Sequence, residues 1–196
     1  MNIGLYFGSF NPVHVGHLII ANHVVNNTDL KQVWFVVSPQ NPFKQSTGLL
    51  NEYNRLHMIN AAIEGENNLR ASSVEFKLPR PSYTVDTLTY LNEKYPEHKF
   101  SIIMGSDSFQ NFDKWKNYEV IIKEHPIYVY RRPGFDVGND LGAKLTILDA
   151  PLLEISSTRI RKMIREKQSI RFLVPDSVKE EIERNGYYKK KSEDPA

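Results

Sequence analysis

Two histidines, His14 and His17, lie three residues apart in a turn that joins two apolar runs. The turn, residues 8–17 with the sequence GSFNPVHVGH, follows the run Ile3–Phe7 and precedes another apolar run. It therefore joins an expected strand to an expected helix, where unpaired backbone N–H groups and the positive end of the helix dipole favour an anion. No Asp or Glu occurs from residue 8 to residue 28. We predict a phosphate site there, with both imidazoles on one face of the first helical turn.

Two other interpretations of the histidine pair remain open. An H-x-x-H pair on one helical face is half of a possible zinc site, but neither a third ligand, a neighbouring carboxylate nor a cysteine accompanies it. Both histidines could also be structural residues at a helix start. The protonation state is undecided, because a helix N-terminus lowers the pKa of an imidazole and a bound triphosphate raises it.

A second anion site is predicted at residues 155–161, with the sequence ISSTRIR. Hydroxyls at Ser156–Thr158 can cap a helix whose apolar stripe contains Ile160, and Arg161 points away from that stripe. An ordinary helix cap with surface arginines is the alternative. Two phosphate-ready helix starts suit a triphosphate whose α-phosphate is attacked while its β- and γ-phosphates are held.

Alternating apolar runs and helical patterns position these two turns. Strands are expected at Ile3–Phe7, Val33–Ser38, Phe100–Met104, Ile127–Tyr130 and Leu145–Leu148, and helices at Leu18–Val25, Glu52–Glu64, Val85–Tyr95, Tyr118–Lys123, Ser157–Arg165 and Asp176–Asn185. This order predicts an α/β fold: a doubly wound, Rossmann-like parallel sheet flanked by helices, with a small helical C-terminal part. Ligands of such sheets lie beyond the C-terminal strand ends, and the loop 39–50 also borders that region.

Length and composition indicate a single domain over residues 1–188, with a helical subdomain from about residue 150 and a disordered tail at 189–196. Of the 196 residues, 40% are hydrophobic and 24% charged, and the formal net charge of +2 argues against a strongly basic nucleic-acid surface. The absence of cysteine excludes disulfide scaffolds, Cys-ligated zinc and thiol nucleophiles. Neither a signal segment nor a membrane span is apparent, so we expect a cytoplasmic protein. The oligomeric state cannot be predicted.

Further motifs support a resemblance that covers residues 3–187. The pair GSFxPxHxxH and SSTxxR resembles the adenylyltransferase branch of the HIGH-type nucleotidyltransferase superfamily, whose members move AMP from ATP onto a phosphate. The segments PSYT (81–84), GSDS (105–108) with Trp115 beyond it, and RRPG (131–134) resemble the bacterial nicotinate mononucleotide adenylyltransferases. Each segment alone is a weak signal, but the set is specific.

The resemblance implies a role for each group of residues. The residues expected at ATP are Gly8, Ser9, Phe10, Gly16, Gly105, Asp107, Arg132, Ser156, Ser157 and Thr158; those expected in catalysis are His14, His17 and Arg161; those expected at the acceptor are Lys44, Tyr83, Thr84 and Trp115. Trp115 would stack on the pyridine ring, and the helix start at Thr84 would favour a carboxylate. Phe43 stands where many family members have His, and the sequence does not decide between Arg131 and Arg132.

The reaction that the resemblance implies is direct attack of a nicotinate mononucleotide phosphate on the α-phosphorus of ATP, which gives deamido-NAD and pyrophosphate. No protein nucleophile is needed, because positioning and charge neutralisation suffice. Mg²⁺ is expected on the triphosphate, held by ATP oxygens and water, since no two-carboxylate cage is apparent. The alternatives are a phosphopantetheine adenylyltransferase, which shares the first motif, and a nucleotide-binding module without turnover.

Overall fold

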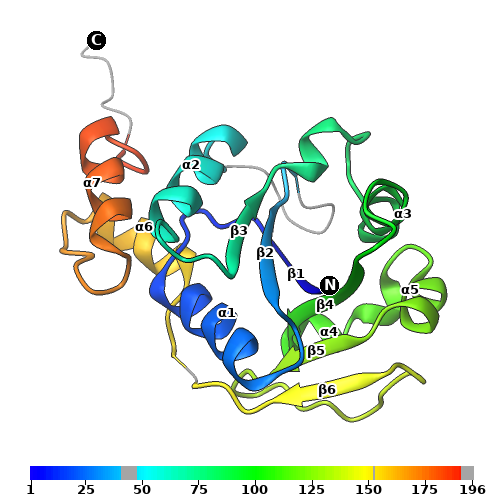
Figure 1. The fold of residues 1–196 in the computed structure, drawn as a ribbon. Helices are drawn as coiled ribbons and strands as arrows, with labels where there is room; N and C mark the ends of the chain where they lie inside the picture. The colour runs from blue at the N-terminus through cyan, green and yellow to red at the C-terminus, as the bar shows by residue number, and fades with distance from the viewer. Residues whose placement is uncertain (41–47, 152, 191–196) are drawn as a thin grey trace.

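The part of the chain that the structure describes, residues 1–40, 48–151 and 153–190 of a computed structural model, is built around a parallel sheet of six strands. In spatial order these are β3 (Leu69–Ser72), β2 (Gln32–Val37), β1 (Asn2–Gly8), β4 (Lys99–Gly105), β5 (Ile127–Tyr130) and β6 (Leu145–Leu148), all neighbours being parallel (Figure 1). The order reverses between β1 and β4. The predicted doubly wound sheet is therefore confirmed.

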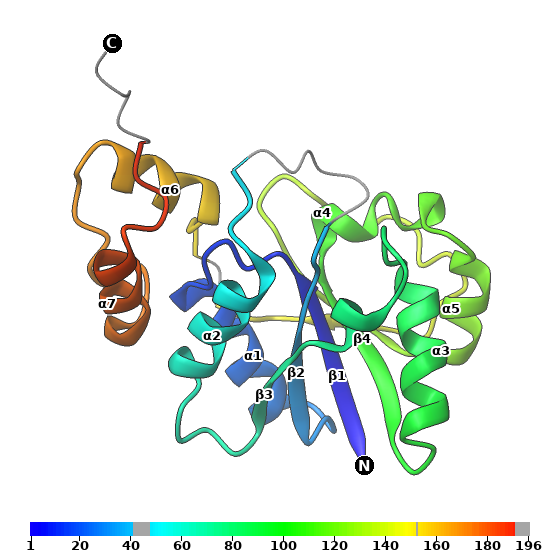
Figure 2. The same cartoon turned by 90° about the horizontal axis from the view of Figure 1, so that it is seen from above.

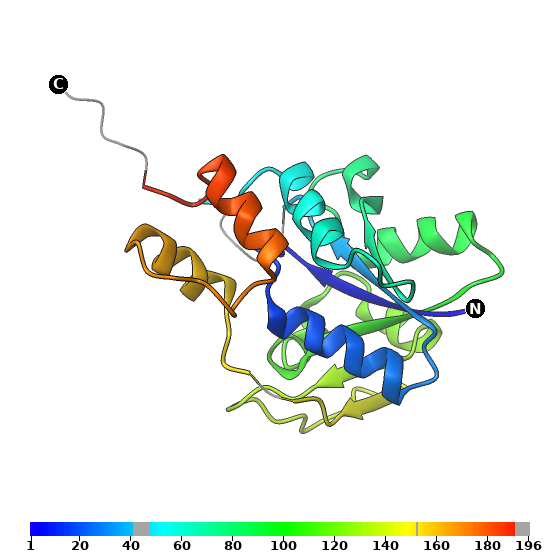
Figure 3. The ribbon, with the colours of Figure 1, turned by 60° about the vertical axis from the view of Figure 1, so that its left-hand side comes forward.

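Helices cover both faces of the sheet, as Figure 2 shows. On one face lie α1 (Val15–Asn27) and α2 (Glu52–Ala62), and on the other α3 (Thr84–Lys94), α4 (Ser106–Phe109) and α5 (Tyr118–Glu124), together with the 3-10 turns η1 (Val74–Lys77) and η2 (Phe112–Lys114). The last two helices, α6 (Ser157–Arg165) and α7 (Asp176–Asn185), lie where α1 begins (Figure 3). The backbone N–H of Val15 donates to the carbonyl of Leu173 at 3.0 Å, and this bond attaches α1 to the segment before α7.

Alternation along the strands creates two hydrophobic cores, one on each face. In β1, Leu5 packs with Leu88 and Leu91 of α3, whereas the next residue, Tyr6, packs with the residues of α1 and α2. Successive side chains of a strand point to opposite faces, so each central strand contributes to both cores. This explains why β1, β2 and β4 read as continuous apolar runs.

The elements differ from the sequence predictions mainly at their ends. Helix α1 is longer than predicted at both ends, and α3 begins and ends one residue earlier. Strand β3 was not predicted, because its four residues LRAS include only one large apolar side chain and lie at a sheet edge. Helix α7 ends just before Gly186, whose φ of 64° is the left-handed conformation in which glycine commonly ends a helix.

Candidate active site

The turn after β1 brings the two predicted histidines into direct contact. Their rings stack with centroids 3.6 Å apart, and the backbone N–H of His14 donates to Nδ1 of His17 at 3.2 Å. His14 is the residue before α1 and His17 lies in its first turn, so the pair flanks the helix start instead of sitting wholly within it. Gly16 makes this possible, because a Cβ there would lie 3.1 Å from Nδ1 of His14.

Burial sets the charge of His14. Its side chain is 4% exposed, and desolvation, with a smaller contribution from Arg132, lowers the pKa of His14 to about 4. The imidazole is therefore neutral at neutral pH in the ligand-free protein. It can donate or accept a hydrogen bond there, but it gains a positive charge only when a bound anion raises its pKa.

Phe10, in the middle of this turn, has an unusual backbone conformation. Phe10 has a φ of 44°, in the left-handed region that side chains other than glycine avoid, although its ring is buried against His17 at a centroid distance of 5.0 Å. Asn11 binds the segment before α2, since its amide donates to the carbonyl of Gly48 and its Oδ1 accepts from the N–H of Leu50. Such conformations are characteristic of functional sites.

The second predicted turn, at the start of α6, is bound directly to the first. Ser157 Oγ donates to the carbonyl of Pro12 at 2.8 Å, and Arg161 Nη1 donates to the carbonyl of Asn11 at 2.7 Å. The predicted cap is confirmed, because Ser156 Oγ accepts from the N–H of Arg159. The two turns predicted to bind anions thus lie together, although 145 residues separate Ser157 from Pro12 in the sequence.

Three cavities open at the C-terminal ends of the strands, and we name each by one residue. The Trp115 cavity lies against α3, the His14 cavity lies between the two helix starts, and the Phe135 cavity lies between the segments 131–135 and 153–156. Together they occupy the crevice beyond β1 and β4, where the strand order reverses. This is the position at which doubly wound sheets bind ligands.

The His14 cavity gathers most of the residues predicted for ATP and for catalysis. Its lining includes Gly8, Ser9, Phe10, His14, His17, Asp107, Arg132, Ser156, Ser157, Thr158 and Arg161. Gly16 lies in the Phe135 cavity and Gly105 in the Trp115 cavity. The single carboxylate in the His14 cavity, among its described residues, belongs to Asp107, whose Oδ1 lies 3.4 Å from Nε of Arg132. The cavity is therefore polar and cationic in character, as an anion requires.

Arg132, rather than Arg131, faces the His14 cavity. The backbone N–H of Arg132 donates to Ser106 Oγ at 2.8 Å, and its Nη2 donates to the hydroxyl of Tyr130 at 3.3 Å. Arg131 is exposed and lines only the Phe135 cavity. Gly105 allows this packing, because a Cβ there would collide with the carboxylate of Asp107 and approach Nε of Arg132 to 3.1 Å.

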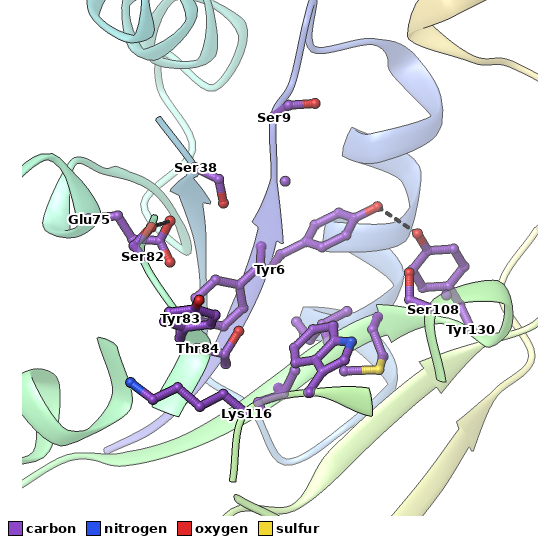
Figure 4. A pocket seen from close by; sticks show the side chains of 17 residues that line it. Tyr6, Ser9, Ser38, Glu75, Ser82, Tyr83, Thr84, Ser108, Lys116 and Tyr130 are labelled. Carbon is purple, nitrogen blue, oxygen red and sulfur yellow. Dashed lines mark hydrogen bonds between the residues drawn. The ribbon is translucent and has the colours of Figure 1, made fainter. Parts of the chain in front are cut away.

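The Trp115 cavity contains the residues predicted for the acceptor. Thr84 is the first residue of α3, with Tyr83 before it as the cap residue, and Trp115 is half-buried beside Phe112 at a ring distance of 4.9 Å. Lys116 Nζ lies 4.6 Å from the centre of the Tyr83 ring and 3.1 Å from the carboxylate of Asp86. Figure 4 shows Thr84 and Lys116 on one side of this cavity. The fourth predicted residue, Lys44, and its neighbour Phe43 lie outside the described residues.

Sequence reasoning missed several residues that line the same cavity. Glu75 is 2% exposed, and its carboxylate accepts hydrogen bonds from Ser82 Oγ at 2.9 Å and Thr87 Oγ1 at 3.0 Å, which attaches η1 to the start of α3 (Figure 4). Burial raises the pKa of Glu75, and its hydrogen bonds to hydroxyl groups oppose that rise. Ser82 was part of the quoted PSYT motif, but no local pattern singles out Glu75, Tyr6 or Tyr130.

Arg55, in α2, connects the loops after β1 and β2. Its side chain is fully buried, and its guanidinium donates to the carbonyls of Ser9, Ser38, Pro39 and Leu50. A charged group that donates only to backbone oxygens positions the chain around it. Ser9 and Ser38 line the Trp115 cavity, so Arg55 holds one wall of the site.

The described residues contain no group of three or more His, Cys, Asp or Glu residues arranged to hold a metal ion. Among the same residues, none of the helices combines the length and apolar composition that a bilayer crossing requires.

Comparison with known proteins reveals close relatives. Residues 5–163 match the model of the cytidylyltransferase-like family. A protein of Flavobacterium psychrophilum named "Probable nicotinate-nucleotide adenylyltransferase" is 51% identical over 193 residues, which cover 97% of this chain and all of that one. One of the same name from Cytophaga hutchinsonii is 51% identical over 191 residues, which cover 96% of this chain and 98% of the relative.

A solved structure has the same fold. It is titled as the nicotinic acid mononucleotide adenylyltransferase of Plasmodium falciparum complexed with NaAD, and it superposes with a TM-score of 0.79 over 95% of this chain and 97% of its own. Its sequence is 21% identical, so this likeness concerns the fold alone.

Proposed function

Because this chain belongs to the cytidylyltransferase-like family and, within it, to the nicotinate-nucleotide adenylyltransferases, we propose that its site transfers AMP from ATP to nicotinate mononucleotide. The products are deamido-NAD and pyrophosphate. The observation that carries the proposal is the shared wall of two cavities. A cavity between the starts of α1 and α6 and a cavity with a half-buried indole beside the start of α3 meet at Gly8 and Ser9.

The reaction is direct in-line displacement at the α-phosphorus of ATP. The attacking phosphate oxygen is already anionic near neutral pH, so the protein needs to position two anions and to neutralise the charge that develops on the pyrophosphate. His14, His17 and Arg161 surround the His14 cavity and would hold the triphosphate. Neutral His14 would act as a hydrogen-bond donor, and Arg161 would supply permanent charge.

The acceptor would bind in the Trp115 cavity. The indole of Trp115 would stack on the pyridine ring, a contact that contributes about 1 kcal/mol beyond the buried area. The carboxylate would meet the first N–H groups of α3 and the hydroxyl of Thr84, because a helix N-terminus favours an anion. Lys116 also lines this cavity, and its charge is paired with that of Asp86. These features favour nicotinate over nicotinamide mononucleotide.

Mg²⁺ would enter as part of the ATP complex, coordinated by phosphate oxygens and water. The single carboxylate among the described residues of the His14 cavity, that of Asp107, is paired with Arg132. This carboxylate suits a contact to ribose or metal-bound water better than a dedicated metal cage. A reaction that consumes ATP fits the cytoplasm, and we assign the protein to that compartment.

The test is an acceptor comparison. The protein would be incubated with ATP, Mg²⁺ and either nicotinate mononucleotide, nicotinamide mononucleotide or phosphopantetheine, and pyrophosphate release would be measured. We expect rapid release with nicotinate mononucleotide, slower release with its amide and none with phosphopantetheine. Release with phosphopantetheine but with neither mononucleotide would refute the proposal, and so would the absence of release with all three acceptors.

A further inference from the structure

Two tyrosines, Tyr6 at the end of β1 and Tyr130 at the end of β5, lie where the three cavities meet. Among the described residues they are the two that line the Trp115, His14 and Phe135 cavities alike. Both belong to the same hydrophobic core, and their side chains are 4% and 5% exposed. Their aromatic rings are thus fixed by packing, whereas their hydroxyl groups border the site.

The hydroxyls of the two tyrosines form a hydrogen-bonded pair. The oxygens lie 3.2 Å apart and point toward one another across the cavity wall (Figure 4). Nη2 of Arg132 donates to the Tyr130 hydroxyl at 3.3 Å, and its guanidinium carbon lies 5.4 Å from the centre of that ring. Asp107 in turn lies against Nε of Arg132. A chain of polar contacts therefore fixes where the Tyr130 oxygen lies.

Counting protons shows that the pair can donate to a ligand. Two hydroxyls carry two protons, and the Tyr6 hydroxyl donates one of them to the Tyr130 oxygen, so the remaining proton belongs to Tyr130. Arg132 acts only as a donor, so it cannot accept the second proton. Within the described part of the chain, no acceptor for that second proton is present. Burial, assisted by Tyr130, raises the pKa of Tyr6 well above its usual range, so its hydroxyl stays protonated at neutral pH.

The proposed reaction requires a hydrogen-bond donor at such a junction. In-line displacement at the α-phosphorus has three groups to place around one atom: the nucleoside, the leaving pyrophosphate and the attacking phosphate. Three cavities share the wall formed by Tyr6 and Tyr130, so one group placed in each would bring the phosphorus that joins them beside these two hydroxyls. Donors fixed beside developing charge give the largest catalytic contributions.

We propose that Tyr130 is a catalytic residue, whose hydroxyl donates a hydrogen bond to a non-bridging oxygen of the transferring α-phosphoryl group. Tyr6 and Arg132 are positioning residues, since they hold the Tyr130 oxygen in place. This inference rests on the proposed AMP transfer and adds to it a donor outside the two helix starts. It assigns a chemical role to residues that neither anion-binding turn contains.

The test compares Tyr130→Phe with Tyr128→Phe. Tyr128 lies two residues earlier in β5 and in the same core, but its hydroxyl donates to Asp29, away from the three cavities. We expect Tyr130→Phe to lower kcat by ~10²–10³-fold with both KM values nearly unchanged, and Tyr128→Phe to keep wild-type kcat. Tyr6→Phe should lower kcat less, and the double variant Tyr6→Phe with Tyr130→Phe should match Tyr130→Phe alone, because the two hydroxyls act as a unit.

A substitution in the substrate distinguishes contact from structural support. ATP with sulfur in place of either non-bridging α-oxygen would be compared in wild type and Tyr130→Phe. If Tyr130 contacts one oxygen, the variant loses the penalty for sulfur at that position only. Three results would overturn the inference while AMP transfer by the wild type stands. These are an unchanged kcat in Tyr130→Phe, an effect of that variant on KM alone, and an equal loss of the sulfur penalty with both isomers of the substituted ATP. Absence of wild-type transfer would overturn both.

Discussion

Replacing Arg55 with methionine is expected to destabilise the whole protein and to loosen one wall of the site. The guanidinium is fully buried and donates to four backbone carbonyls, among them those of Ser9 and Ser38 at the ends of β1 and β2. Methionine fills much of the same volume but provides no donor. The four carbonyls would then lose their partner while the surrounding packing is largely kept.

The magnitude follows from the burial of these carbonyls. A hydrogen bond from a charged group contributes about 1.5–3 kcal/mol, so four of them give a gross loss on the order of 6–12 kcal/mol. Two effects reduce this loss: methionine carries no charge to desolvate, and water can reach the half-buried Ser9, Ser38 and Leu50. We expect a net loss of roughly 3 kcal/mol, well below this gross loss.

Urea unfolding followed by tryptophan fluorescence would measure this loss. For a chain of this size, 3 kcal/mol corresponds to a fall in Tm of ~6–12 °C. Arg55→Lys keeps the charge but has three donors for four carbonyls, so it should fall between wild type and methionine. Arg165→Met, at an exposed position in α6, is the matched control and should change stability by less than ~0.5 kcal/mol. A loss of stability below ~1 kcal/mol in Arg55→Met would show that water replaces the guanidinium, and that Arg55 does not hold this wall of the site.

The other predictions concern the site itself. Burial lowers the pKa of His14 to about 4, below the ~6.5 of the unfolded chain, so the stability of the protein should fall as the pH drops from ~6.5 toward 4. His14→Gln should remove roughly 2 kcal/mol of that fall between pH 7 and 4.5. Equal pH profiles of stability in wild type and His14→Gln would contradict this. His17→Ala should lower kcat/KM ~10²–10³-fold with a change in Tm of only a few degrees; loss of activity in parallel with unfolding would refute its catalytic role. Gly105→Ala should raise the KM for ATP ~10-fold or more, because a Cβ collides with the neighbouring carboxylate, whereas Gly138→Ala, where a Cβ meets open space, should leave it unchanged. Trp115→Ala should raise the KM for nicotinate mononucleotide by ~5–10-fold, and Trp115→Phe by less.

The sequence predicted the parts of this fold whose signal is local. The apolar runs at Ile127–Tyr130 and Leu145–Leu148 match β5 and β6 at both ends, and the pattern Ser157–Arg165 matches α6. Side-chain periodicity or a cap residue predicts each of these elements. The positions of the two predicted anion-binding turns at helix starts were also predictable, because a glycine-rich turn and a hydroxyl cap are short-range features.

The parts that sequence reasoning missed depend on tertiary position. Glu75 lies among residues with no distinctive pattern, and its role arises only because η1 packs against α3. Arg55 reads as an ordinary helical cation until the loops after β1 and β2 surround it. Tyr6 and Tyr130 are 124 positions apart and come together because β4 alone separates their strands. Strand order is a property of the whole sheet, so no local window of sequence reveals such pairs.

The bonds from α6 to the first turn also determine when the site can form. Arg161 reaches Asn11 across 150 residues, and Val15 meets Leu173 across a similar separation. Contacts so distant in sequence close late in folding, because the loop entropy must be overcome first. During synthesis the strands emerge before the start of α6 exists, so a nascent chain cannot form the complete site until the residues through Arg161 have left the ribosome. Formation of the site therefore follows the emergence of α6, and pulse-labelled hydrogen exchange at the Val15 amide would report the docking of the C-terminal segment.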